Sequence, residues 1–271
     1  MEHPPVAKPA WSGAELAVLL QMRVHPGRAF RRVPGLDLEG ESVWVAGVEP
    51  GYPAADLWTR LRGLYPQTGM WPVIATGATC ADVGSLGSMY ALPSTTVELD
   101  TDSRAWLLDK LTRLPSTGDA TEAFPRSEQD WSQAVFDGAR EDFRSFGWTD
   151  VWEVAGGAYD RMLLVPAARP WLVPGRLGWL GACNYDFGWR DHATILRRWQ
   201  AVWSTELVAL DRDTMWLRHL EPITAKAPAI EAAREVAVYC PDAINDVDFD
   251  DATLDRLATV LLGPMWRLWW D

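Results

Sequence analysis

Several residue types are scarce in this chain of 271 residues, and each scarcity argues against a class of protein. Lysine occurs only at positions 8, 110 and 226, and acidic residues outnumber basic ones, which gives a formal net charge of −12. Nucleic acids and anionic membranes bind basic surfaces, so neither is an expected partner. No run of eighteen apolar residues is present, and the first residues lack the pattern of a secretory signal. We therefore expect a cytoplasmic protein.

Cysteine is also scarce, and common cofactor motifs are missing. Cys80, Cys183 and Cys240 are far apart and form no CxxC pair, which argues against a disulfide framework and a structural zinc site. Neither a GxGxxG pattern nor a Walker loop follows a predicted strand. The acidic run at 242–251 lacks the glycine and the distal glutamate of an EF-hand loop. The sequence predicts no metal and no cofactor.

Tryptophan, by contrast, is abundant, with 17 residues spread along the chain. Such side chains commonly fill a core, because each buries a large apolar area. Alternatively, some of them form an aromatic surface that binds a partner. With the acidic charge, this second interpretation suggests binding to a basic protein.

The hydrophobic periodicity predicts alternating strands and helices. Residues 25–41 are expected to be a loop, because prolines and glycines interrupt them. Residues 42–49, a helix built on Leu57 to Leu64 and residues 68–77 together have the length of a βαβ unit. Further helices are predicted at 104–114, 127–147, from 192, from 228 and near 251–262. Asp191 is the expected N-cap of the helix from 192, whose predicted apolar face is Ile195, Leu196, Trp199, Val202 and Trp203. In the helix from 228, a solvated face is expected to carry Glu231, Arg234 and Glu235. Further strands are predicted at 160–165, in a hairpin turned by residues 211–213, and at the carboxyl terminus.

These elements predict an α/β or α+β fold, with a mixed sheet, flanking helices and one or two lobes. Residues 115–125 are the expected boundary, because they have the composition of a linker. The predicted divisions are a disordered lead-in at 1–11, an amino-terminal α/β lobe at 12–114 and a carboxyl-terminal α/β lobe at 126–271.

The most informative stretch runs from Leu177 to Leu217, where a glycine- and tryptophan-rich turn precedes an amphipathic helix. One hypothesis makes this turn a thiol active site, with Cys183 as nucleophile, His192 as base and Asn184 or Asp186 as the orienting group. A competing and simpler hypothesis makes the turn structural, tied down by the side-chain amide of Asn184. Some of the candidate binding residues also have a place in this structural hypothesis. The full set of candidate binding residues is Trp179, Asn184, Trp189, Trp199 and Asp271.

Four segments carry a resemblance to a known family: GWLGACNYDF at 178–187, ILRRWQAVWSTELVAL at 195–210, YCPDAIND at 239–246 and the terminal LWWD. The chain resembles a bacterial domain-of-unknown-function family, number 4253, most strongly over 160–271. The segment LWTRLRGLYPQTGMWPVI at 57–74 is similar to the amino-terminal part of many members. The resemblance implies that a set of residues is important in the family, but it assigns them no role. These residues are Asn184, Trp199, Tyr239, Cys240, Pro241, Asp242, Trp269, Trp270 and Asp271.

Three functions are therefore expected in order of preference. The first is a protein-binding module, of the kind found in immunity or antitoxin proteins, with an acidic tryptophan-rich face. The second is a hydrolase or transferase that uses Cys183, His192 and Asp186. The third is a small-ligand sensor with a tryptophan-lined pocket between lobes.

Overall fold

The computed structural model describes residues 31–38, 41–48, 54–82, 99–113, 137–138, 140–141, 159–245 and 254–271. These residues belong to two compact units. The first unit draws on residues 1–99, 152–193 and 207–213, and the second on residues 100–151, 194–206 and 214–271. The expected boundary at 115–125, the lead-in at 1–11 and most of the predicted helix at 127–147 lie outside the described residues.

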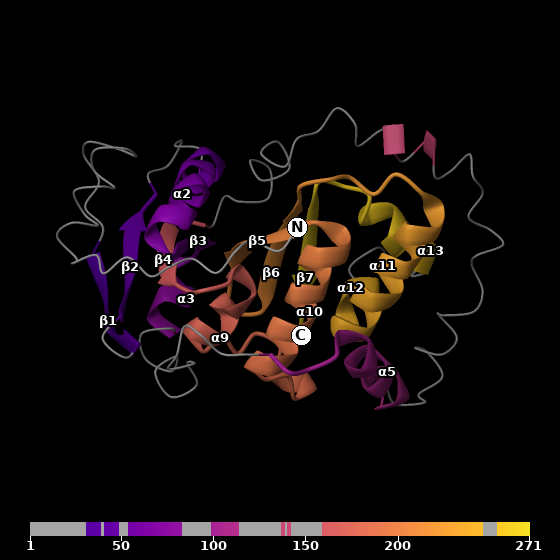
Figure 1. Ribbon diagram of the computed structural model, residues 1–271, viewed down its shortest axis with the longest axis horizontal. Helices are drawn as coiled ribbons and strands as arrows, with labels where there is room; N and C mark the ends of the chain where they lie inside the picture. The colour runs from indigo at the N-terminus through magenta and orange to yellow at the C-terminus, as the bar shows by residue number, and fades with distance from the viewer. Residues whose placement is uncertain are drawn as a thin grey trace. The chain divides into compact units, whose positions relative to one another are not determined.

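A mixed sheet forms the framework of the first unit (Figure 1). Its strands are β1 (Arg31–Leu38), β2 (Glu41–Gly47), β4 (Arg161–Pro166), β3 (Met70–Ala75) and β5 (Thr205–Leu210), in that order. Of β5, residues 207–210 belong to this unit. Only β3 and β5 run parallel; the other neighbouring strands are antiparallel. The predicted mixed sheet with flanking helices is confirmed.

The predicted βαβ unit is present, with another strand inserted into it. Helix α2 (Ala54–Thr68) connects β2 to β3, but β4 lies between them and pairs antiparallel with both. Strands β2 and β3 therefore run in the same direction without pairing, as in a split βαβ unit. The helix ends before Gly69, whose φ of 65° is the left-handed conformation that glycine adopts at helix ends.

Aromatic side chains fix α2 on the sheet. Trp58 and Tyr65 of this helix both contact Trp71 of β3 edge-to-face, at centroid distances of 5.8 and 5.0 Å. Each also uses its polar atom: the Trp58 indole donates to the carbonyl of Pro72, and the Tyr65 hydroxyl to that of Ala167. The apolar face predicted from Leu57 to Leu64 is buried as expected.

Short helices follow two strands of this sheet. Helix α3 (Gly77–Asp82) follows β3 almost directly. After β4 come the 3₁₀ helix η2 (Pro170–Leu172), α9 (Val173–Leu177) and the 3₁₀ helix η3 (Cys183–Tyr185). Arg176 of α9 is fully buried and donates to the carbonyl of Pro166, which ties α9 to the end of β4.

The second unit combines an antiparallel strand pair with helices. Strand β6 (Thr214–His219) pairs with β7 (Met265–Trp269), the predicted carboxyl-terminal strand. The helices are α5 (Ser103–Arg113), most of α10 (Trp189–Trp203), α11 (Lys226–Tyr239), α12 (Asp242–Asn245) and α13 (Leu254–Val260), and Figure 1 shows α11, α12 and α13 in orange and yellow. Tyr239 contacts both Trp199 and Trp270 edge-to-face, at centroid distances of 5.3 and 5.2 Å.

Several local predictions were wrong. Residues 31–38 form β1, which pairs with β2 through a bulge, so the segment predicted as a loop is largely a strand. This segment has no regular alternation of apolar and polar residues. Its strand conformation depends instead on the pairing with β2, which the sequence does not reveal. Asp191 does not precede α10 as an N-cap: it lies in the first turn, and its carboxylate accepts from the backbone N–H of Gly188 at 2.9 Å, as the third residue of a capping box does.

Tryptophan is mainly a core residue in the described part of the chain. Of the tryptophans whose burial the structure describes, none is exposed. The buried ones are Trp58, Trp71, Trp106, Trp179, Trp199, Trp203, Trp216, Trp266 and Trp270. Their indole N–H groups repeatedly donate to carbonyls or carboxylates, which is how a buried indole avoids an unsatisfied donor.

Candidate functional site

Two parallel strands of the first unit end side by side. Residues Ile74 and Ala75 of β3 are paired with Ala209 and Leu210 of β5. The segments that follow, Thr76–Asp82 and Asp211–Arg212, therefore leave the same edge of the sheet. In α/β sheets, ligands commonly bind outside the carboxyl ends of parallel strands, because the connecting segments diverge there.

Asp211 joins the two segments. One carboxylate oxygen, Oδ1, accepts from the hydroxyls of Thr76 and Thr79 at 2.9 and 2.8 Å. The same oxygen accepts from the backbone N–H of Arg212 at 2.8 Å, which fixes the turn. Three donors on one oxygen hold the carboxylate in position. Thr79 is almost completely buried, so this network is part of the framework of the site.

Trp179 forms a wall beside this network, and three features fix its position. Gly178 ends α9 with a φ of 60°, which turns the chain sharply. The Trp179 indole N–H donates to the backbone carbonyl of Asp211 at 2.6 Å. A Cβ on Gly181 would lie 2.0 to 2.6 Å from atoms of the Trp179 ring, so the ring occupies space that only glycine leaves open.

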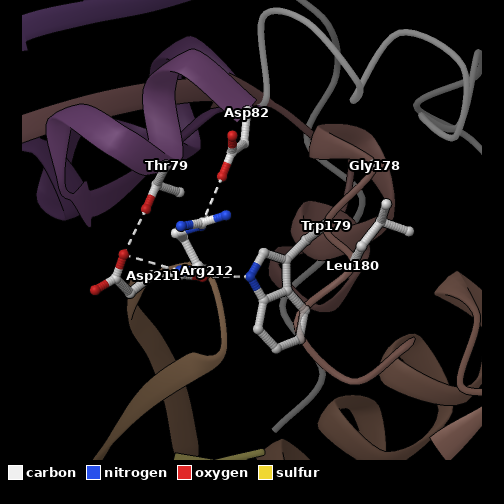
Figure 2. A pocket seen from close by; sticks show the side chains of 7 residues that line it. All are labelled: Thr79, Asp82, Gly178, Trp179, Leu180, Asp211 and Arg212. Atoms are coloured by element: carbon white, nitrogen blue, oxygen red, sulfur yellow. Dashed lines mark hydrogen bonds and ion pairs between the residues drawn. The ribbon is translucent and has the colours of Figure 1, made fainter. Parts of the chain in front are cut away.

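Between these elements is a cavity of about 190 Å³, shown in Figure 2. An ion pair lies at its edge: Nε of Arg212 is 3.1 Å from Oδ2 of Asp82, and the two side chains are 70% and 45% exposed. Figure 2 shows the guanidinium of Arg212 between Asp82 and the Trp179 ring. The lining residues are Thr79, Asp82, Gly178, Trp179, Leu180, Asp211 and Arg212.

The residues of the thiol hypothesis follow the cavity residue Leu180 along the chain, but their environments differ from one another. Cys183 is exposed in η3, where its Sγ is 3.9 Å from Oδ1 of Asn184. Asp186 follows η3 in the left-handed conformation, with a φ of 55°. His192 is completely buried, and burial lowers its pKa to about 4, which leaves the imidazole neutral at neutral pH. Its ring packs against Trp179 at a centroid distance of 5.0 Å, behind the wall of the cavity.

The other candidate binding residues are dispersed. Trp179 lines the cavity. Trp189 is half-buried, and the guanidinium of Arg190 lies over its ring, 4.4 Å from the ring centroid. Trp199 is completely buried in the second unit. Asp271 is exposed, and its backbone N–H donates to the Asp242 carboxylate at 3.0 Å.

A buried carboxylate in the second unit corrects another prediction. Glu235 was expected on a solvated face of its helix, yet it is only 6% exposed. Arg198 donates to both of its oxygens, and the Trp199 and Trp203 indoles donate to Oε2 at 2.9 and 3.4 Å. Local spacing could not indicate this cluster, because three of its four side chains come from another helix, α10.

Four cavity residues were not predicted as site residues: Thr79, Asp82, Asp211 and Arg212. Asp211 and Arg212 were assigned only to a turn, and Thr79 and Asp82 lay in an unassigned segment. Their common signal is position, since polar residues follow two buried strands directly. That signal acquires meaning only when the two strands are known to be parallel neighbours.

The described residues also bear on metal binding and on membrane insertion. Within these ranges, no three or more His, Cys, Asp and Glu side chains gather in a way that would hold a metal ion. No helix in the same part of the chain combines the length and the apolar character that a membrane span requires.

Comparison with known proteins gives one match. Residues 161–271 match the family model of a domain of unknown function, DUF4253, which confirms the resemblance over this part of the chain. No curated protein and no solved structure gives a significant match.

Proposed function

We propose that this protein, whose residues 161–271 are similar to DUF4253, binds a small molecule in the cavity beside Trp179. The observation that carries the proposal is the place of the cavity, outside the carboxyl ends of the parallel strands β3 and β5. Of its lining residues, Gly178, Trp179, Leu180, Asp211 and Arg212 belong both to the matched region and to the stretch that the sequence singles out.

The rigidity of the cavity wall supports this proposal. A hydrogen bond, a left-handed glycine and the close approach to Gly181 all hold Trp179 in one position. A site that is already ordered loses less conformational entropy when a ligand binds. The volume of about 190 Å³ is below the range of about 300–1,000 Å³ that suits drug-sized ligands, so the expected ligand is a small metabolite.

A pair of leucine variants tests this proposal. Leu180→Trp adds bulk to the cavity lining, whereas Leu220→Trp adds the same bulk at a position that is 46% exposed and outside the lining. In protein labelled with ¹⁵N-tryptophan, the Trp179 indole signal is the one that Trp179→Phe removes. We expect at least one member of a metabolite panel to shift this signal in the wild type and in Leu220→Trp, but not in Leu180→Trp.

Two results would contradict the proposal. One is a Trp179 signal that no panel member moves. The other is a shift that persists undiminished in Leu180→Trp, since that would place the ligand elsewhere.

A second candidate function is the binding of a basic protein, as an immunity or antitoxin protein does. The net charge of −12 favours it, because complementary charge accelerates encounter. The described tryptophans add little to this argument, since none of them is exposed. If it is correct, a purified cationic partner will form a complex with this chain that weakens steeply as salt is added. A complex insensitive to salt would count against it.

A further inference from the structure

We infer that the ligand of the Trp179 cavity carries an anionic group, a carboxylate or a phosphate, on a small apolar body. Arg212 binds the anionic group, and Trp179 and Leu180 contact the body. This inference rests on the proposed function and specifies its ligand class.

The donor capacity of Arg212 is the first argument. A guanidinium has five N–H donors in a planar fork, which suits the paired oxygens of carboxylate and phosphate. The contact with Asp82 is through Nε. Among the described residues, no hydrogen bond engages the two terminal nitrogens, and the side chain is 70% exposed. Arg212 can therefore bind a ligand anion with its terminal nitrogens while its Nε remains directed at Asp82.

The distribution of charge around the cavity is the second argument. Among the described residues that line the cavity, Arg212 is the only cation. The Asp211 carboxylate is stabilised by the hydroxyls of Thr76 and Thr79 and by a backbone N–H, so it needs no ligand cation. The Asp82 carboxylate would repel a ligand anion bound to the terminal nitrogens of Arg212. That repulsion is weak, because both side chains of the ion pair are largely exposed.

The character of the wall is the third argument. The indole N–H of Trp179 is directed at the Asp211 carbonyl, so what Trp179 offers a ligand is its apolar ring. Leu180 extends the same surface. A ligand whose body were strongly polar would leave its own groups without partners against these side chains.

Four aromatic probes of matched size separate the possible ligand classes: benzoate, phenyl phosphate, benzylamine and benzyl alcohol. Each is titrated into the full chain, and the Trp179 indole signal reports binding. We expect benzoate or phenyl phosphate to bind with a dissociation constant on the order of millimolar, as suits so few atoms. The stronger of the two identifies the preferred anion. Binding no weaker by benzylamine or benzyl alcohol would overturn the inference.

Substitutions of the ion pair give an independent test, because their effects differ in sign. We expect Arg212→Ala to weaken anion binding about tenfold, the lower end for a charged hydrogen-bonded contact. Arg190→Ala, which removes an exposed arginine outside the lining, should leave binding unchanged. Asp82→Asn should tighten anion binding several-fold, because it removes a negative charge beside the bound anion. Weaker binding in Asp82→Asn would instead indicate that Asp82 attracts a cationic ligand, and would overturn the inference.

The failures of the two proposals are distinguishable. If the probes bind at Trp179 but the cation or the alcohol is preferred, only the ligand class is wrong. If none of the four moves the Trp179 signal, or if Leu180→Trp leaves the shifts intact, the cavity is not a binding site and both proposals fail.

Discussion

Replacing Glu235 by glutamine should destabilise the protein strongly, although the substitution only exchanges one carboxylate oxygen for an amide NH₂ group. The single N–H of Arg198 Nε is shared between both carboxylate oxygens, at 3.0 Å from each, and Nη2 donates to Oε1 at 2.5 Å. It also accepts from two indoles, and its side chain is only 7% exposed. A glutamine amide would direct its own N–H donors at these donors and would remove the buried counter-charge of the guanidinium.

The magnitude follows from burial. Removing one partner of a fully buried ion pair costs about 3–5 kcal/mol. Because the Arg198 side chain retains 18% exposure, we expect a lower value, about 2–4 kcal/mol, in the free energy of unfolding. Glu231→Gln is the matched control: it neutralises a carboxylate of the same helix that approaches the same arginine at 3.6 Å, but is 59% exposed. It should cost no more than about 1 kcal/mol.

Urea denaturation of the three proteins measures both effects, with the unfolding free energy obtained from the midpoint and the slope. A loss in Glu235→Gln no larger than that in Glu231→Gln would refute the argument. It would mean that the cluster of Arg198, Trp199, Trp203 and Glu235 is solvated and contributes little.

Three further predictions concern other parts of the molecule. Gly181→Ala should lower the unfolding free energy by about 1–3 kcal/mol and shift the Trp179 indole signal, because the new methyl group overlaps the ring; an unmoved signal would contradict this. Burial lowers the pKa of His219 from 6.5 to about 4, so between these values the unfolded chain binds a proton that the folded chain does not. Stability should therefore fall as the pH drops from about 6.5 to about 4, by up to about 3 kcal/mol from this residue, and less steeply in His219→Leu; equal slopes in urea melts would count against it. A thiol reagent near pH 8 should modify exposed Cys183 first, since Cys240 is buried and burial raises the pKa of Cys80 to about 11; a fast phase that survives Cys183→Ser would be the contrary result.

The thiol hypothesis and the binding proposal make different demands on the same turn. Catalysis requires His192 to accept a proton from Cys183 at the working pH. A buried imidazole with a pKa of about 4 is a weak base at neutral pH. The binding proposal asks of His192 only that it pack behind Trp179, where its ring is found.

Elements with a strong local signal were predictable. Helix α2 and strand β2 were predicted because their apolar residues recur at helical and strand spacing. Strands β3, β4 and β7 were predicted as short apolar or aromatic segments next to glycine or proline. The amphipathic face of α10 was also correct at Ile195, Leu196, Trp199 and Trp203. It was wrong at Val202, which is 46% exposed. Periodicity gives the direction of a face more reliably than its width.

The class of fold and the family resemblance over residues 161–271 could be predicted from the sequence alone, and the glycine- and tryptophan-rich turn could be singled out as a candidate site. These depend on local patterns that short segments carry. Three features became visible only in the folded chain: β4 lies between β2 and β3, β3 and β5 end together, and Asp82 meets Arg212 across 130 positions of the chain. Strand order and ion pairing are contacts between distant segments, and no local spacing encodes them. The cavity beside Trp179 exists because of those contacts.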